Sequence, residues 1–157
     1  MKAQAKIEFL VTTFIFLVFI VFISKFFSDS VSKMIYDLKM ERIKTKAENI
    51  IEILACEKGI PENWHSGIRH SSISRIGLAS DKPYVLLEEK IEALNSNCDL
   101  FSQVFDVKSY RLIIIDEDGN ILLNCGIKSY VGAHFERAVL VNSTELKKAK
   151  LILDIWW

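Results

Sequence analysis

The chain has 157 residues, and its 20 Lys and Arg balance its 20 Asp and Glu, so the formal net charge is zero. This balance argues against nucleic-acid binding, which needs a strongly basic surface. Half of the residues are hydrophobic, and most of the ten phenylalanines lie within residues 9–27. Beyond that segment about 130 residues remain, enough for one domain with a hydrophobic core of its own.

The first predicted element is an apolar helix at the N-terminus. Residues 9–23 carry no charge, and their only polar side chains are those of Thr12 and Thr13. With its flanks this run is long enough to cross a bilayer, since about 20 residues at about 1.5 Å each span about 30 Å. A secretory signal peptide would have a shorter apolar core followed by a small-residue cleavage site. We therefore expect the segment to stay on the protein as a membrane span.

Glu8 stands at the edge of this run, where a carboxylate drawn into lipid costs a few kcal/mol. The stretch Ala3-Gln4-Ala5-Lys6-Ile7-Glu8 resembles an archaeal class III signal peptide, the export signal of type IV pilin-like proteins. In that family a short basic leader is cut before a Gln, and a Glu is the fifth residue of the mature chain. The apolar segment then becomes the packed core of a filament.

This resemblance implies that a prepilin peptidase cuts between Ala3 and Gln4. It also implies that Glu8 pairs with the free amino terminus of a neighbouring subunit, a buried ion pair that would set the register of assembly. The sequence departs from the family pattern in its leader of only three residues and in Lys6, where a small or hydroxylated residue is commoner. The alternative is an uncleaved membrane anchor with a juxtamembrane Glu.

From Ser28 onward the sequence becomes amphipathic. Apolar residues recur at helical spacing: Val31, Ile35, Leu38, Ile43, Ala47, Ile50 and Leu54. No Gly or Pro precedes Gly59, so the pattern predicts one helix from about Ile7 to Cys56. Gly59 and Pro61 are typical helix-stop residues. The lower half of this helix is expected to pack against the domain.

Three features follow the predicted helix in order. They are the turn sequence Gly59-Ile-Pro-Glu-Asn-Trp64, the segment Gly77-Leu-Ala, and a predicted short helix over residues 82–94 with Lys90 near its middle. This order again resembles archaeal pilin-like ectodomains. The physical interpretation is structural, because Trp64 would bury a large surface and Gly77 would allow close backbone approach.

The C-terminal half is predicted to form a helix over residues 99–106 and two β-hairpins. The first hairpin pairs residues 110–116 with 121–125 around Asp118-Gly119, and the second pairs residues 138–142 with 150–156. The predicted fold is α+β, in which a long membrane-spanning helix continues into a globular domain with short helices and a four-stranded antiparallel sheet. The predicted parts are a leader (1–3), a transmembrane or filament-core half-helix (4–27) and an extracytoplasmic pilin-like domain (28–157).

Two features favour a domain outside the cytoplasm, at the cell surface or in the envelope. Asn142-Ser143-Thr144 is a glycosylation sequon, and Cys98 and Cys125 are candidates for a disulfide. Cys56 is the expected free thiol, although it could compete for either partner. Lys and Arg flank the apolar run on both sides, so the positive-inside rule does not decide the orientation.

No catalytic signature is present. The sequence has no nucleophile elbow, phosphate loop, zinc motif or paired-carboxylate pattern, and Asp116, Glu117 and Asp118 fit a turn better than a calcium site. His65, His70 and His134 lack ligand spacing on one element and are expected at the surface or in loops. We therefore expect no enzyme, no metal and no cofactor.

Two functions remain at this stage. The first is a structural subunit, major or minor, of a type IV pilus-like filament or pseudopilus, with a prepilin peptidase, other pilin-like subunits and the membrane as partners. The second is a membrane-anchored sensor-like module, because residues 112–123 resemble the Asp-x-x-Gly hairpin of extracytoplasmic sensor domains. Such sensors signal through a second membrane helix or a cytoplasmic module. The sequence contains neither, which favours the subunit.

Overall fold

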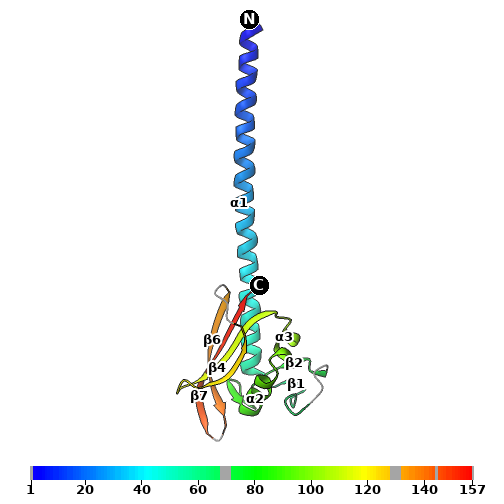
Figure 1. The fold of residues 1–157 in the computed structure, drawn as a ribbon, viewed down its shortest axis with the longest axis vertical. Helices are drawn as coiled ribbons and strands as arrows, with labels where there is room; N and C mark the ends of the chain where they lie inside the picture. Colours follow the sequence, from blue (N-terminus) through cyan, green and yellow to red (C-terminus); the bar gives the residue numbers. More distant parts are fainter. Residues whose placement is uncertain (1, 68–71, 128–131, 144, 157) are drawn as a thin grey trace. The chain divides into compact units, whose positions relative to one another are not determined.

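The structure is a computed structural model that describes residues 2–67, 72–127, 132–143 and 145–156. The chain forms two compact units, Met1–Lys39 and Met40–Trp157, and each is described by itself. Helix α1 (Lys2–Cys56) supplies the whole of the first unit and the beginning of the second (Figure 1). The sequence prediction of one uninterrupted helix ending at Cys56 is confirmed. Without Gly or Pro, every turn can keep its backbone hydrogen bonds.

The second unit is organised around the last turns of α1. Five apolar residues at spacings of one to four lie on one helix face and are almost completely buried: Ala47, Ile50, Ile51, Leu54 and Ala55. The sheet packs on this face, with Leu112, Ile114, Leu123, Leu151 and Leu153 in the same core. Figure 1 shows strands β4, β6 and β7 passing beside these turns. The fold is therefore α+β, with a helix layer and a sheet layer.

A small two-stranded sheet follows α1. Strand β1 (Gly59–Ile60) pairs antiparallel with β2 (Arg75–Ile76). Trp64 is 3% exposed, and its indole Nε1 donates a hydrogen bond of 3.1 Å to the carbonyl oxygen of Gly77. A Cβ on Gly77 would lie 2.0 Å from the carbonyl oxygen of Glu57. The burial of Trp64 and the close backbone approach at Gly77 are thus confirmed.

The next segment differs from its prediction. Residues 82–94 do not form one helix, because strand β3 (Val85–Leu87) precedes helix α2 (Glu88–Ser96). Helix α3 (Asp99–Phe105) agrees with its predicted range. Phe101 of α3 is fully buried, and its ring centroid lies 4.4 Å from that of Tyr110.

The main sheet has five strands in the order β3-β6-β7-β4-β5. Both predicted hairpins are confirmed: β4 (Ser109–Asp116) with β5 (Ile121–Gly126), and β6 (Ala133–Asn142) with β7 (Leu146–Trp156). The second hairpin is longer than predicted. The prediction of four antiparallel strands is wrong, because β3 adds to β6 in parallel and makes the sheet five-stranded and mixed. A three-residue strand followed at once by a helix shows too little alternation to be recognised.

Candidate functional site

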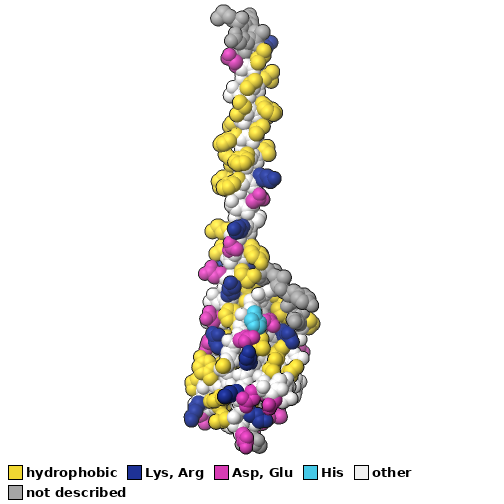
Figure 2. Space-filling view, turned by 90° about the vertical axis from the view of Figure 1, so that its left-hand side faces the viewer, with side chains coloured by type: hydrophobic (Ala, Val, Ile, Leu, Met, Phe, Trp, Pro, Cys, Tyr) yellow, Lys and Arg dark blue, Asp and Glu magenta, His cyan; other side chains and the backbone are white. Residues whose placement is uncertain are grey.

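The most distinctive surface in the first unit is the apolar section of α1. The most apolar 18-residue window of this helix is 0% buried, and the helix is long and apolar enough to span a membrane. Phe9, for example, is 71% exposed. In Figure 2 the hydrophobic side chains of this section lie between charged side chains at its two ends. A continuous apolar surface of this extent is typical of a helix that lipid or other helices surround.

The predicted assembly residues lie at the beginning of this helix. Ala3 and Gln4, the expected cleavage site, belong to the first turn of α1. The hydroxyls of Thr12 and Thr13 each donate a hydrogen bond of 2.8 Å to the carbonyl oxygens of Glu8 and Phe9, so they are satisfied within the helix. The carboxylate of Glu8 is exposed and forms no ion pair with any residue that the structure describes. It is therefore available to a partner.

In the second unit, a polar cluster joins α1 to the sheet. Arg137 of β6 donates from Nε to Oε1 of Glu52 at 2.6 Å, and the hydroxyl of Tyr84 donates to Oε2 of the same carboxylate at 2.9 Å. The hydrogen bond from Arg137 lowers the pKa of Glu52. The Cys56 thiol and the Glu52 carboxylate raise the pKa of Tyr84 to about 12. Sequence analysis missed this cluster, because nothing local marks Glu52 and Arg137 as partners.

The structure joins Cys98 and Cys125 in a disulfide across a sequence separation of 27. This bond ties the segment between α2 and α3 to the edge strand β5. Cys56 is free and partly buried, with its Sγ 3.6 Å from Oε2 of Glu52. The predicted pairing and the predicted free thiol both agree with the structure.

Asn142, the glycosylation candidate, is the last residue of β6, and its side chain is exposed. The third sequon residue, Thr144, lies outside the described residues. An exposed position beside a hairpin turn is one that a glycosylating enzyme could reach. Glycosylation of Asn142 stays a prediction.

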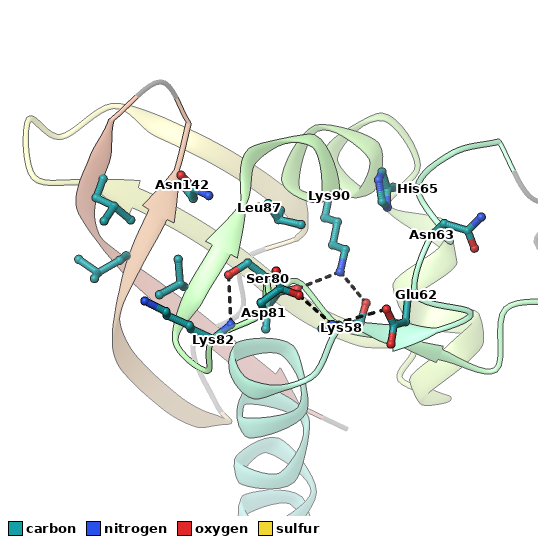
Figure 3. A pocket seen from close by; sticks show the side chains of 14 residues that line it. Lys58, Glu62, Asn63, His65, Ser80, Asp81, Lys82, Leu87, Lys90 and Asn142 are labelled. Carbon is teal, nitrogen blue, oxygen red and sulfur yellow. Dashed lines mark hydrogen bonds and ion pairs between the residues drawn. The ribbon is translucent and has the colours of Figure 1, made fainter.

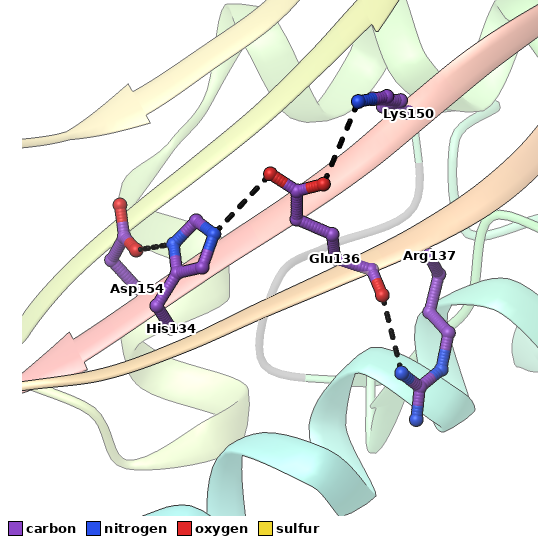
Figure 4. Close-up of polar contacts among 5 residues, drawn as sticks. All are labelled: His134, Glu136, Arg137, Lys150 and Asp154. Atoms are coloured by element: carbon purple, nitrogen blue, oxygen red, sulfur yellow. Dashed lines mark hydrogen bonds and ion pairs between the residues drawn. The ribbon is translucent and has the colours of Figure 1, made fainter.

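A row of charged side chains lies on the face of the sheet that points away from α1. His134 bonds through Nδ1 to Asp154 and lies 3.3 Å through Nε2 from Glu136, which in turn lies 3.6 Å from Nζ of Lys150 (Figure 4). The hydrogen bond to Asp154 raises the pKa of His134. His134 is therefore a surface residue but lies on a strand. His65 is partly buried, and His70 falls outside the described ranges.

The acidic turn of the first hairpin is explained by its own geometry. Oδ1 of Asp116 accepts hydrogen bonds from the backbone N–H groups of Asp118 at 3.0 Å and Asn120 at 2.7 Å. The hydrogen bond from the Asn120 side chain lowers the pKa of Asp116. The turn interpretation is confirmed, and this hairpin carries no argument for a ligand site. Among the described residues, no three His, Cys, Asp or Glu side chains gather as a metal site.

Comparison with known proteins adds nothing to these observations. The chain matches no protein-family model, no curated protein and no solved structure. Its function must therefore be inferred from the apolar helix and from the surfaces of the domain.

Proposed function

We propose that this chain is a pilin-like or minor pilin-like structural subunit that assembles into a surface filament or pseudopilus through its N-terminal helix. The observation that carries the proposal is the apolar section of α1, which is exposed all round, with the carboxylate of Glu8 at its N-terminal end and unpaired among the described residues. A helix that is hydrophobic all round is stable in a membrane or buried in the core of an assembly. A filament subunit is held first in the membrane and then in the core of the filament, so its helix must suit both surroundings.

The charge of Glu8 gives the assembly its specificity. Apolar helices gain little from the hydrophobic effect when they associate in lipid, because lipid tails are as apolar as the helices. An ion pair between Glu8 and a new amino terminus at Gln4 of an adjacent subunit would add a directional contact. Stranding one member of such a buried pair costs about 3–5 kcal/mol. The pair would therefore decide which axial register forms.

The rest of the chain has the properties expected of a domain that such a helix would carry to the cell surface. The last turns of α1 are built into the core of the second unit, and Arg137 of the sheet holds Glu52 of the helix. The disulfide suits a domain that matures in an oxidising compartment. We propose on these grounds that the domain lies outside the cytoplasm and that a prepilin peptidase removes residues 1–3.

The test compares Glu8→Gln with the wild type at equal membrane levels. We expect Glu8→Gln to insert normally, because a neutral amide is easier to accommodate in lipid. Assembly, measured by cross-linking or filament yield, should fall by two or more decades, as the loss of about 3–5 kcal/mol predicts. Glu41→Gln is the matched control, since Glu41 is an exposed carboxylate of the same helix, and it should assemble like the wild type.

Intact mass of the membrane-extracted proteins shows whether both variants begin at Gln4, so that a processing defect is not mistaken for an assembly defect. Equal assembly by Glu8→Gln and wild type would refute the role of Glu8. Retention of residues 1–3 in all of the native protein would refute the peptidase step.

A further inference from the structure

The three sequence features that follow α1 surround one pocket. The pocket has a volume of about 640 Å³ and lies between the turn after α1, the segment after Gly77, helix α2 and the turn end of the β6–β7 hairpin (Figure 3). This volume is within the range of about 300–1,000 Å³ that small-molecule sites occupy. The assembly function proposed above makes no use of it.

The group that distinguishes this pocket is the ammonium of Lys90. Lys90 is 2% exposed, and its Nζ donates hydrogen bonds of 2.8 Å to the carbonyl oxygen of Lys58 and 2.9 Å to that of Ala79. An ammonium has three donors, and the described residues offer the third no hydrogen-bond acceptor. Burial lowers the pKa of Lys90, as expected for a cation removed from water.

Two carboxylates that line the pocket, those of Asp81 and Glu62, favour the charge of Lys90 electrostatically but are paired with another lysine. Lys58 forms ion pairs with Asp81 at 2.9 Å and with Glu62 at 3.5 Å, whereas Lys90 has no ion pair with any described residue. A purely structural role for Lys90, joining the end of α1 to Ala79, explains its two carbonyl contacts. It does not explain why a full charge is buried there, since two carbonyl dipoles compensate a cation only in part.

The remaining walls favour an amphipathic ligand. Four aliphatic side chains line one side of the pocket: Val85, Leu87, Leu140 and Leu146. His65 also lines the pocket, and its buried Nδ1 has no hydrogen-bond partner among the residues that the structure describes. Among the described residues, the pocket therefore combines a buried cation that is only partly compensated and a ring nitrogen without a hydrogen-bond partner with an apolar wall.

We propose that this pocket binds a small organic molecule that carries a carboxylate on a short aliphatic chain. The carboxylate would accept the third N–H of Lys90, and the chain would lie against the aliphatic wall. A phosphate group fits less well, because it carries more negative charge than a carboxylate and the carboxylates of Glu62 and Asp81 line the same pocket. The proposal goes beyond the assembly function and does not depend on it.

The test is calorimetric titration of the full chain in lipid nanodiscs, with empty nanodiscs as the blank. Hexanoate is the probe, 1-hexanol keeps the chain without the charge, and acetate keeps the charge without the chain. We expect hexanoate to bind about 10- to 100-fold more tightly than hexanol, the usual worth of a hydrogen bond to a charged group. Acetate should bind at least about 10-fold more weakly than hexanoate, because acetate has no methylene groups to bury against the aliphatic wall.

Substitutions at exposed positions locate the site without disturbing the fold. Leu146 is 63% exposed at the pocket wall, so Leu146→Glu should leave the domain folded but repel the ligand, weakening hexanoate binding at least about 10-fold. Ile121→Glu is the matched control, since Ile121 is 59% exposed on the opposite edge strand, and it should bind like the wild type.

Several results would overturn the proposal. Equal affinity for hexanoate and hexanol would mean that Lys90 plays no part, and unchanged binding by Leu146→Glu would place the site elsewhere. Absence of hexanoate binding at millimolar concentrations, or preferential binding of inorganic phosphate, would remove the carboxylate assignment. None of these outcomes bears on the Glu8 assembly test, so the two proposals fail separately.

Discussion

Opening the disulfide between Cys98 and Cys125 is expected to destabilise the domain strongly. The bond closes a loop across a sequence separation of 27 that contains α3 and the whole of β4. On the chain-entropy relation a loop of this length is worth about 3.5 kcal/mol, through the freedom that it denies the unfolded chain. Domains typically unfold at a cost of about 5–15 kcal/mol, so this is a large share of the total.

The assay is urea unfolding of the full chain in nanodiscs, with and without a reductant, followed by tryptophan fluorescence, to which the buried Trp64 contributes. With a urea dependence of about 1–3 kcal/mol per molar, the loss predicts a midpoint lower by roughly 1–3 M in the reduced protein. Cys56→Ala is the control, because Cys56 is free and its replacement leaves the loop closed. A reduced midpoint that moves no further than the Cys56→Ala midpoint would refute the reasoning.

Two further predictions use the same unfolding assay. Gly77→Ala should destabilise the domain by about 3 kcal/mol, because the new Cβ would lie 2.0 Å from the backbone carbonyl oxygen of Glu57. Gly119 has open space around it but a φ of +85°, so Gly119→Ala should cost only backbone strain of about 1–2 kcal/mol, and the reverse order would contradict the packing argument. His134→Gln should cost at most about 1 kcal/mol, and more near pH 5.5 than near pH 8.5. The pKa of His134 is raised in the folded state, so its contribution is complete below the unfolded value of about 6.5 and disappears as pH rises through the folded pKa. A cost that grows with pH would disprove the assignment.

Elements with a long, regular pattern could be predicted from the sequence. Helix α1 follows from an unbroken run of helix-compatible residues with an apolar stripe, and the β4–β5 hairpin follows from alternating residues around Asp118-Gly119. Strand β3 could not be predicted, because its three residues acquire strand geometry only by pairing with Leu140, Val141 and Asn142, far along the chain. Local pattern carries no information on such pairing.

The same limit applies to the two sites. Glu8 is visible in the sequence, because a single charge beside an apolar run stands out against its neighbours. The role of Lys90 is not visible in the sequence, because a lysine within a short predicted helix normally points to solvent. The acceptors of its buried ammonium are the carbonyl oxygens of Lys58 and Ala79, which the fold brings to Lys90 from two other segments of the chain. The pocket could therefore be found only in three dimensions.

The parallel pairing of β3 with β6 also sets an order in which the domain can form. Each antiparallel hairpin joins neighbouring stretches of chain, whereas Val85 meets Leu140 only after the long intervening segment has been brought back. Closing this long loop costs conformational entropy before the strand contacts can offset it, so non-local pairs of strands form slowly. We expect the hairpins to form early and β3 to dock late. Because Val85 and Leu87 line the pocket beside Leu140, the binding cavity would be completed in the last step of folding, and a bound ligand would slow the first step of unfolding.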